Sequence, residues 1–338
     1  MKLRILAACA LACAFASGAA TAVYAQGDKT KQAEVKVSGG ERDAFAKFEK
    51  VKGTEAKLQA GSEFVKKYPK STLRPQVAKA VADEIAKTTD EQLKISLAET
   101  YLDFFSDPSE AALVNDALLN AYINAGSTDK AFKMGSARLA KNPEDVDLLR
   151  SLTVIASNET IKDNKTYSAQ GLQYGAKAIE LLEADKRPEG VDEAKWAAYK
   201  AESLPTLYRA TGIIAYKTDD KATAMARLQK AADMKFSDPG VYLILSELTY
   251  DDYDRLSKEY NVAPAAQKTA ALAKAQAALD RVIETYAQAV GMTEGNAQYQ
   301  PAHDALKEDV TKFYKFRHNN SDQGLQQLLD KYKKPAGQ

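Results

Sequence analysis

The chain is poor in the residues that most often perform chemistry: its 338 residues include two cysteines, two histidines and one tryptophan. Both cysteines, Cys9 and Cys13, lie within the first 25 residues, so no thiol follows them. The chain beyond residue 25 therefore has no disulfide, no cysteine nucleophile and no cysteine-based zinc or iron–sulfur site. The two histidines, His303 and His318, leave little for a histidine metal site or a catalytic triad.

Neither charge sign dominates, and long hydrophobic runs are missing. Lysine and arginine together number 47 against 46 aspartate and glutamate, which excludes the basic excess of a typical nucleic-acid-binding protein. Beyond residue 25, no segment approaches the roughly 18 consecutive apolar residues that mark a membrane-spanning helix. We therefore expect no nucleic-acid partner and no membrane span in the mature chain.

Short catalytic and ligand-binding motifs are also absent. The chain has no Gly-x-Ser-x-Gly elbow, no phosphate loop ending in Gly-Lys-Ser/Thr and no His-Glu-x-x-His. The densest acidic cluster, residues 251–254, has Leu256 where a calcium loop requires glycine. We interpret this cluster as a solvated turn between helices, and we expect no catalytic residue, no cofactor and no metal.

The first 25 residues have the pattern of an export signal. Lys2 and Arg4 are followed by the apolar stretch Ile5–Ala16 and then by Val23-Tyr24-Ala25, the small-x-small pattern that signal peptidase cuts. Cleavage after Ala25 would leave 313 residues with no cysteine. A short alanine-rich signal of this kind predicts a bacterial protein, periplasmic or secreted.

Two alternatives to cleavage are weaker. The apolar stretch is shorter than the roughly 20 residues of a membrane anchor. Lipidation at Cys9 or Cys13 is the other alternative, because Leu6-Ala7-Ala8-Cys9 has the letters of a lipobox. The apolar run before Cys9 is too short for a working lipoprotein signal, so we expect a cleaved, unlipidated chain.

The remaining sequence predicts an all-α protein. Residues 26–40 are polar and predict a disordered leader, whereas residues 41–338 predict a single helical domain closed by capping helices at 321–333. Alanine is abundant, with 59 residues, and glycine and proline fall mostly between periodic segments. Two stripes at helical spacing are Leu93, Leu97, Tyr101 and Phe104, and Leu272, Leu279, Val282, Tyr286 and Val290. The pattern indicates about fourteen helices joined by short turns.

Three segments share a spacing of large and small residues. The positions are Leu118, Tyr122, Ala131 and Pro143 in one segment, Tyr208, Gly212, Tyr216, Ala224, Leu228 and Ala231 in another, and Tyr242, Leu245, Ala275, Leu279 and Val282 in the third. Small residues at a helix crossing allow close approach, and large ones fill the space beside it.

This arrangement resembles the tetratricopeptide repeat family, most strongly over residues 205–238 and less so over 112–145. The chain departs from the family at Gly135 and Arg138, and it carries an insertion between Tyr250 and Ala263. The resemblance implies a right-handed superhelix of α-hairpins, an α-solenoid. It also implies a concave groove faced by Asp116 and Asn120 in one repeat and by Thr206 and Arg209 in another.

Two aromatic features are candidates for partner contacts. Trp196 is an anchor for a partner or, as we favour, a core residue. The run of bases and aromatics at 312–318 suits an anionic ligand or a nucleic acid, but helical spacing places Phe313 and Phe316 on a packing face. We therefore interpret this run as part of the cap of the array.

We expect a non-catalytic scaffold or adaptor of the bacterial cell envelope that binds a protein or peptide partner. One alternative is an accessory or degenerate α-superhelical cell-wall enzyme, which would need a deep pocket with a buried carboxylate and several aromatics. The other is a small-molecule-binding helical protein, which would need an enclosed apolar cavity.

Overall fold

The computed structural model describes residues 37–333, which form fourteen α-helices and one 3₁₀ turn, with no strand in that range. The all-α prediction and the number of helices are therefore confirmed. The predicted signal with its cleavage site at Ala25, and residues 26–36 of the leader, lie outside the described residues.

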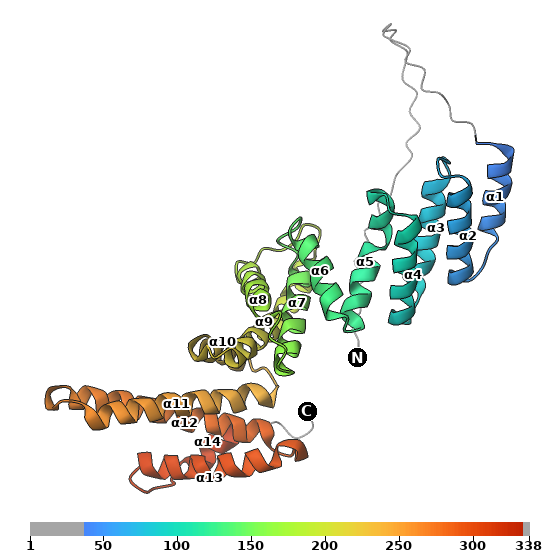
Figure 1. Cartoon of the computed structure of the whole chain (residues 1–338). Helices are drawn as coiled ribbons and strands as arrows, with labels where there is room; N and C mark the ends of the chain where they lie inside the picture. Colours follow the sequence, from blue (N-terminus) through green and yellow to red (C-terminus); the bar gives the residue numbers. More distant parts are fainter. Residues whose placement is uncertain (1–36, 334–338) are drawn as a thin grey trace, which may run out of the picture.

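Five helices form the N-terminal part of the array, seen in blue to green in Figure 1. They are α1 (Gly39–Glu49), α2 (Thr54–Lys67), α3 (Arg74–Lys87), α4 (Glu91–Phe104) and α5 (Pro108–Asn124). The first helix begins earlier than the expected boundary at residue 41, because Ser38 caps it: the Glu41 amide donates to the Ser38 hydroxyl, and the Ser38 amide donates back to the Glu41 carboxylate at 2.8 Å.

Five further helices form the centre: α6 (Thr128–Leu139), α7 (Val146–Ile161), α8 (Ser168–Glu183), α9 (Glu193–Lys217) and α10 (Lys221–Asp233). The best-matching repeat was expected to begin at Pro205, but α9 continues through Pro205 back to Glu193. The following turn is as expected, since Asp220 caps α10 by accepting from the Thr223 amide at 3.0 Å.

The C-terminal part contains two of the longest helices. Its elements are α11 (Pro239–Val262), α12 (Ala265–Thr293), η1 (Ala297–Tyr299), α13 (Gln300–Arg317) and α14 (Leu325–Lys331). The predicted closing helix within 321–333 is α14, and Leu325 and Leu329 bury its apolar side. Within residues 37–333, no helix combines the length and the apolar composition that a membrane crossing requires.

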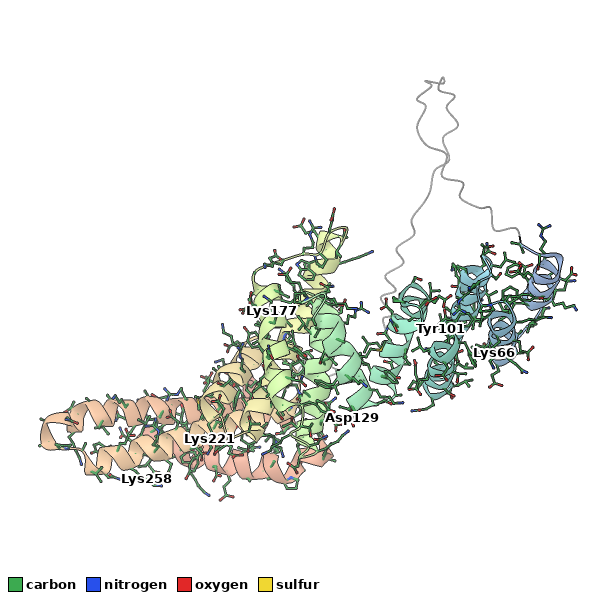
Figure 2. All side chains as sticks on the ribbon, turned by 45° about the horizontal axis from the view of Figure 1, so that its top comes forward. Lys66, Tyr101, Asp129, Lys177, Lys221 and Lys258 are labelled. Atoms are coloured by element: carbon green, nitrogen blue, oxygen red, sulfur yellow. The ribbon has the colours of Figure 1, made fainter. Side chains whose placement is uncertain are left out.

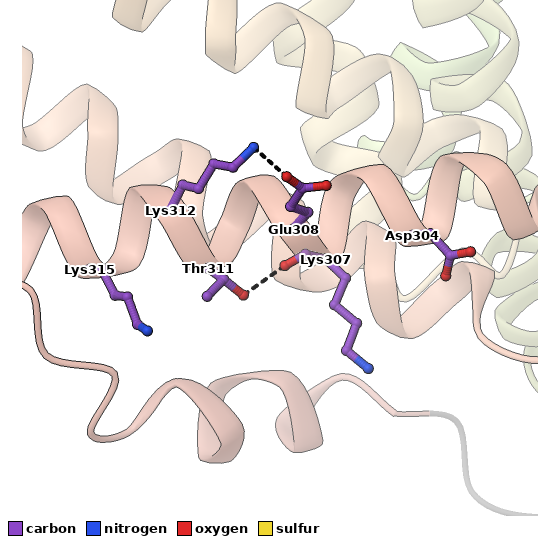
Figure 3. A pocket seen from close by; sticks show the side chains of 6 residues that line it. All are labelled: Asp304, Lys307, Glu308, Thr311, Lys312 and Lys315. Carbon is purple, nitrogen blue, oxygen red and sulfur yellow. Dashed lines mark hydrogen bonds and ion pairs between the residues drawn. The ribbon is translucent and has the colours of Figure 1, made fainter.

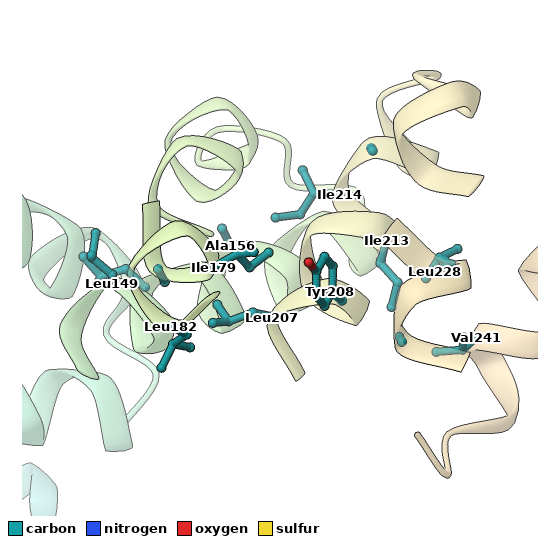
Figure 4. Close-up of a cluster of buried hydrophobic side chains, with 14 of the residues drawn as sticks. Leu149, Ala156, Ile179, Leu182, Leu207, Tyr208, Ile213, Ile214, Leu228 and Val241 are labelled. Atoms are coloured by element: carbon teal, nitrogen blue, oxygen red, sulfur yellow. The ribbon is translucent and has the colours of Figure 1, made fainter. Parts of the chain in front are cut away.

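The hairpin array is interrupted twice. Alternate helices pack on each other at α2 and α4, α3 and α5, and α7 and α9, as stacked repeats require. Across the described helices this packing is much weaker from α5 to α7 and from α9 to α11, where α6 and α10 make most of the connection, although buried residues of α11 still share a cluster with α9. The buried residues group into three clusters: one mainly in α1–α5, a central one that runs from α6 to the first half of α11, and one formed by α12, α13 and α14. Figure 4 shows part of the central cluster, where Leu207 and Tyr208 of α9 lie between α7, α8 and α10.

Small residues at the helix crossings explain the repeat-like spacing. A Cβ added at Gly212 would lie 2.7 Å from Cγ of Leu228, so α9 and α10 approach closely there. Gly135, a departure from the family pattern, has the same role: its added Cβ would lie 2.9 Å from Cδ1 of Leu152 in α7. The glycine therefore permits close packing between α6 and α7.

Two expectations about side-chain environment were wrong. Residues 251–254 do not form a turn; they lie inside α11, where Asp252 pairs with Arg255 and Arg281, both at 2.6 Å. The insertion after Tyr250 thus lengthens α11 instead of forming a loop. Phe316 was expected on a packing face, but it is 73% exposed, because it lies in the last turn of α13 with no helix over it.

Candidate binding groove

The two N-terminal candidate residues lie on the surface of α5. Asp116 is exposed and pairs with Arg138 of α6, the second residue that departs from the family pattern. Asn120 is also exposed, one turn further along the same helix. The structure thus gives Arg138 an electrostatic partner where the family has a small residue.

The other two candidates lie on α9. The Thr206 hydroxyl donates to the carbonyl of Glu202 at 2.9 Å, and the Arg209 guanidinium pairs with Asp238, the N-cap of α11. Because α5 packs on α3, α4 and α6 whereas α9 packs on α7, α8 and α10, the two pairs of candidates do not form one site. Their role in binding stays a prediction.

A groove that the sequence did not reveal lies where α10 meets the α11–α12 hairpin. It encloses about 470 Å³. It is lined by Ala222, Met225, Ala226 and Gln229 of α10, Thr249 of α11, and Arg281, Glu284, Thr285 and Gln288 of α12. The two walls are about 60 residues apart in the sequence, so no local motif marked the groove.

The floor of the groove is held by buried hydroxyl groups. The hydroxyls of Thr249 and Thr285 lie 2.8 Å apart, and both residues are buried. The Ser246 hydroxyl also lies 3.4 Å from the Thr285 carbonyl. These contacts join α11 to α12 at one register, and they position the α12 side chains that face α10.

The walls combine apolar and amide groups. Half-buried Met225 and the small Ala222 and Ala226 give α10 an apolar side with room for a ligand side chain. Gln229 donates to Asp233 at 2.9 Å, which leaves its carbonyl oxygen available. On the opposite wall, the buried carbonyl oxygen of Gln288 accepts no hydrogen bond. The carbonyl oxygen of Gln229 can therefore accept a hydrogen bond from the main chain of an extended peptide.

Two ion pairs border the groove. Arg281 pairs with Asp252 at 2.6 Å, and Glu284 pairs with Lys331 of α14 at 2.8 Å. Glu284 also accepts a hydrogen bond from the Tyr332 hydroxyl. Burial opposes ionisation of Glu284, but the hydrogen bonds from Lys331 and Tyr332 outweigh it and lower the pKa of the carboxyl. The charges of Arg281 and Glu284 are therefore each neutralised by a partner, and Glu284 links the α12 wall of the groove to α14.

A second hollow, of about 490 Å³, lies along α13 and is shown in Figure 3. All six lining residues belong to that helix: Asp304, Lys307, Glu308, Thr311, Lys312 and Lys315. Lys312 pairs with Glu308 at 2.7 Å and the Thr311 hydroxyl donates to the Lys307 carbonyl at 2.7 Å. Among residues 37–333, no aromatic side chain lines either hollow.

Trp196 and His303 are engaged in packing. Trp196 is buried, as favoured from the sequence, and its indole donates to Asp185 at 2.8 Å. His303 is buried, with Nδ1 3.1 Å from the Val290 carbonyl. Within residues 37–333, no group of three or more histidine, cysteine, aspartate or glutamate side chains is placed to hold a metal ion.

Of the comparisons with known proteins, only the one with solved structures gives a match to report. No family model matches the chain, and no curated protein sequence matches it. Among solved structures, a tetratricopeptide repeat protein from Parabacteroides merdae ATCC 43184 is similar at 12% identity and a TM-score of 0.34, over 86% of this chain and 95% of that one. Similarity at this level adds nothing about function. The tetratricopeptide-like character of the chain rests on its own helical hairpins and on the small residues at their crossings.

Proposed function

We propose that the protein is a non-catalytic scaffold or adaptor that binds an extended segment of a protein partner in the groove between α10 and α12. The observation that carries this proposal is the composition of the groove, with an apolar wall at Met225 and the carboxamide of Gln229 on the same helix, α10, opposite the polar side chains of α12. Such a site suits a peptide main chain with a small apolar side chain directed at α10.

The groove itself supports binding better than chemistry. Its ionisable side chains, Arg281 and Glu284, are each paired with a residue outside the groove. The cell-wall enzyme alternative would require a buried carboxylate together with aromatics, and the small-molecule alternative would require an enclosed apolar cavity. Neither hollow offers these features, so no specific observation favours either alternative.

The location we propose is the bacterial cell envelope, periplasmic or secreted. It is supported by the sequence of residues 1–25 alone, which has the regions of a cleavable signal. The mass of the protein purified from its native cells tests this proposal. We expect an N-terminus at Gln26 and no lipid; a retained Met1 or a lipid on Cys9 would contradict it.

Photo-cross-linking tests the groove. A photoreactive residue in place of Gln229 is expected to capture a discrete partner in living cells, and Ala226→Arg is expected to abolish capture by filling the groove. Ala112→Arg is the matched control, because both alanines are exposed on helices and Ala112 lies on α5. A second probe at Asn120 tests the site expected from the sequence.

Capture at Gln229 that Ala226→Arg leaves unchanged would overturn the groove as the binding site. Capture at Asn120 alone would place the partner on α5 instead.

A further inference from the structure

The α11–α12 hairpin extends beyond the rest of the C-terminal part as an arm, defined here as residues 254–280. The last turn of α13 ends beside its base, where Arg317 pairs with Asp280 at 2.8 Å. Figure 1 shows both helices continuing past the end of α13, and Figure 2 shows the same projection from another direction, with Lys258 on it. Within the arm, burial is confined to Ala275, Ala278 and Leu279 near the base.

The apex of the arm is apolar and exposed. Val262 is 83% exposed at the end of α11, and the chain continues through Ala263 and Pro264 into Ala265 and Ala266 without a charge. Val262 has the largest exposed fraction among the large hydrophobic residues of the described chain. A convex apolar apex cannot enclose a small ligand, but it can insert into a groove of a protein or into a membrane surface.

Within the described residues, the stretch that begins at the apex carries unpaired positive charge, because the acidic residues that flank it, Glu259 and Asp280, are paired with Arg255 and Arg317. From residue 260 to residue 279 there are two lysines, Lys268 and Lys274, and no acidic residue. The whole chain, by contrast, has nearly equal numbers of bases and acids. Lys268 lies with Nζ 4.6 Å from the centre of the half-buried Tyr260 ring, so an aromatic and a cation adjoin the apex.

We propose that the apex of the arm inserts into the surface of an anionic phospholipid membrane. Val262 and Pro264 would enter the acyl boundary, Tyr260 would lie at the headgroup level, and Lys268 and Lys274 would contact lipid phosphates. A membrane surface is fluid and can deform around a convex apolar apex. The negative charge of the membrane complements residues 260–279, which contain two lysines and no acidic residue. This proposal is independent of the peptide groove, which lies at the base of the hairpin.

Vesicle flotation tests the proposal with the chain processed at Ala25, because an uncleaved signal would itself bind lipid. Binding is expected to vesicles of equal phosphatidylglycerol and phosphatidylcholine but not to pure phosphatidylcholine, and it should weaken with salt. Val262→Asp and the double change Lys268→Glu with Lys274→Glu should each weaken binding at least tenfold, since each lysine near an anionic surface contributes about fivefold.

Matched controls lie elsewhere on the surface. Leu113→Asp changes a residue that is 44% exposed on α5, and Lys133→Glu with Lys141→Glu reverses two exposed lysines. These variants should bind like the unaltered chain. Val262→Trp should show a blue-shifted emission on binding, measured as the difference from the chain with Trp196 alone.

Equal binding to neutral and anionic vesicles, or none to either, would overturn the proposal. So would loss of binding in the lysine variant together with an unshifted emission from the Val262→Trp variant, because that result indicates adhesion by charge without insertion.

Discussion

Glu110 of α5 accepts two hydrogen bonds from the Arg74 guanidinium of α3, from Nε at 2.7 Å and from Nη2 at 2.9 Å. The Glu110 side chain is only 7% exposed, and Arg74 also donates to the Phe104 carbonyl at 2.8 Å. The ion pair raises the pKa of Arg74 further, chiefly through the hydrogen bond to Glu110. It thus joins helices that are two apart in the N-terminal part of the array.

Removing Glu110 should destabilise that part strongly. Glu110→Ala leaves a largely buried guanidinium without its carboxylate, and we expect a loss of about 3 kcal/mol in the free energy of unfolding, measured in urea. Asp83→Ala is the control, since the Lys79–Asp83 pair is exposed and should contribute less than about 0.5 kcal/mol. Equal effects of the two variants would contradict the importance of the buried pair.

The three buried clusters should unfold with separate midpoints. Trp196, the sole tryptophan, lies in the central cluster and reports on it by fluorescence, whereas circular dichroism reports on all helices. Glu110 belongs to the N-terminal part, so Glu110→Ala should lower a circular dichroism transition and leave the Trp196 midpoint unchanged. A shift of both midpoints by the same amount would instead indicate one cooperative unit.

The contact between α7 and α8 should tolerate no added methyl group. A Cβ at Gly171 would lie 2.4 Å from Cβ of Ala156, and neither atom can turn away, so Gly171→Ala should cost about 2 kcal/mol in thermal or urea unfolding. Combining it with Ala156→Gly should recover at least about 1 kcal/mol of that loss. Gly39→Ala meets no atom of residues 37–333 within 4 Å and should change stability little.

Docking of α14 should weaken in acid. The pKa of Glu284 is lowered in the folded chain from the ordinary value of 4.5, so its contribution is fully present above 4.5 and is lost as the pH falls through the lower folded value. Hydrogen exchange of the α14 amides, corrected for intrinsic rates, should show more opening at about pH 3.5 than at about pH 6. Glu284→Gln should open α14 at both pH values and remove the difference; a difference that persists would assign it to another carboxylate.

Local sequence signals predicted where the helices lie, but they did not predict which helices pack on one another. Asp220 and the small residues Gly212 and Ala224 lie where the repeat pattern placed them, because capping and close helix approach act over a few residues. The stripe from Leu272 to Val290 predicts one packing face, yet Leu272 is 38% exposed whereas Leu279 is buried. The difference arises because Leu272 lies on the arm, beyond the end of α13. The periodic pattern of α12 does not indicate where α13 stops covering it.

The binding groove likewise depends on contacts between helices that the sequence pattern does not specify. Position in the repeat predicts that Asp116 and Arg209 face a groove, and this stays a prediction; the structure adds that Asp116 pairs with Arg138 of α6 and Arg209 with Asp238, the N-cap of α11. Gln229 of α10 and Gln288 of α12 line the same groove only because α10 packs on the α11–α12 hairpin, a contact between residues about 60 positions apart.

The sequence by itself determined that the chain is all-α, that its helices carry small residues at their crossings, and that beyond residue 25 it contains no thiol chemistry. These properties follow from composition and from periodicity over a few turns. Only the tertiary structure decided that the array has three buried clusters, that a groove opens between α10 and α12, and that an arm projects with Val262 at its apex. The physical reason is that a helical stripe states which side of a helix is apolar, whereas the helix that covers it, and how far it extends, depend on contacts between residues distant in sequence.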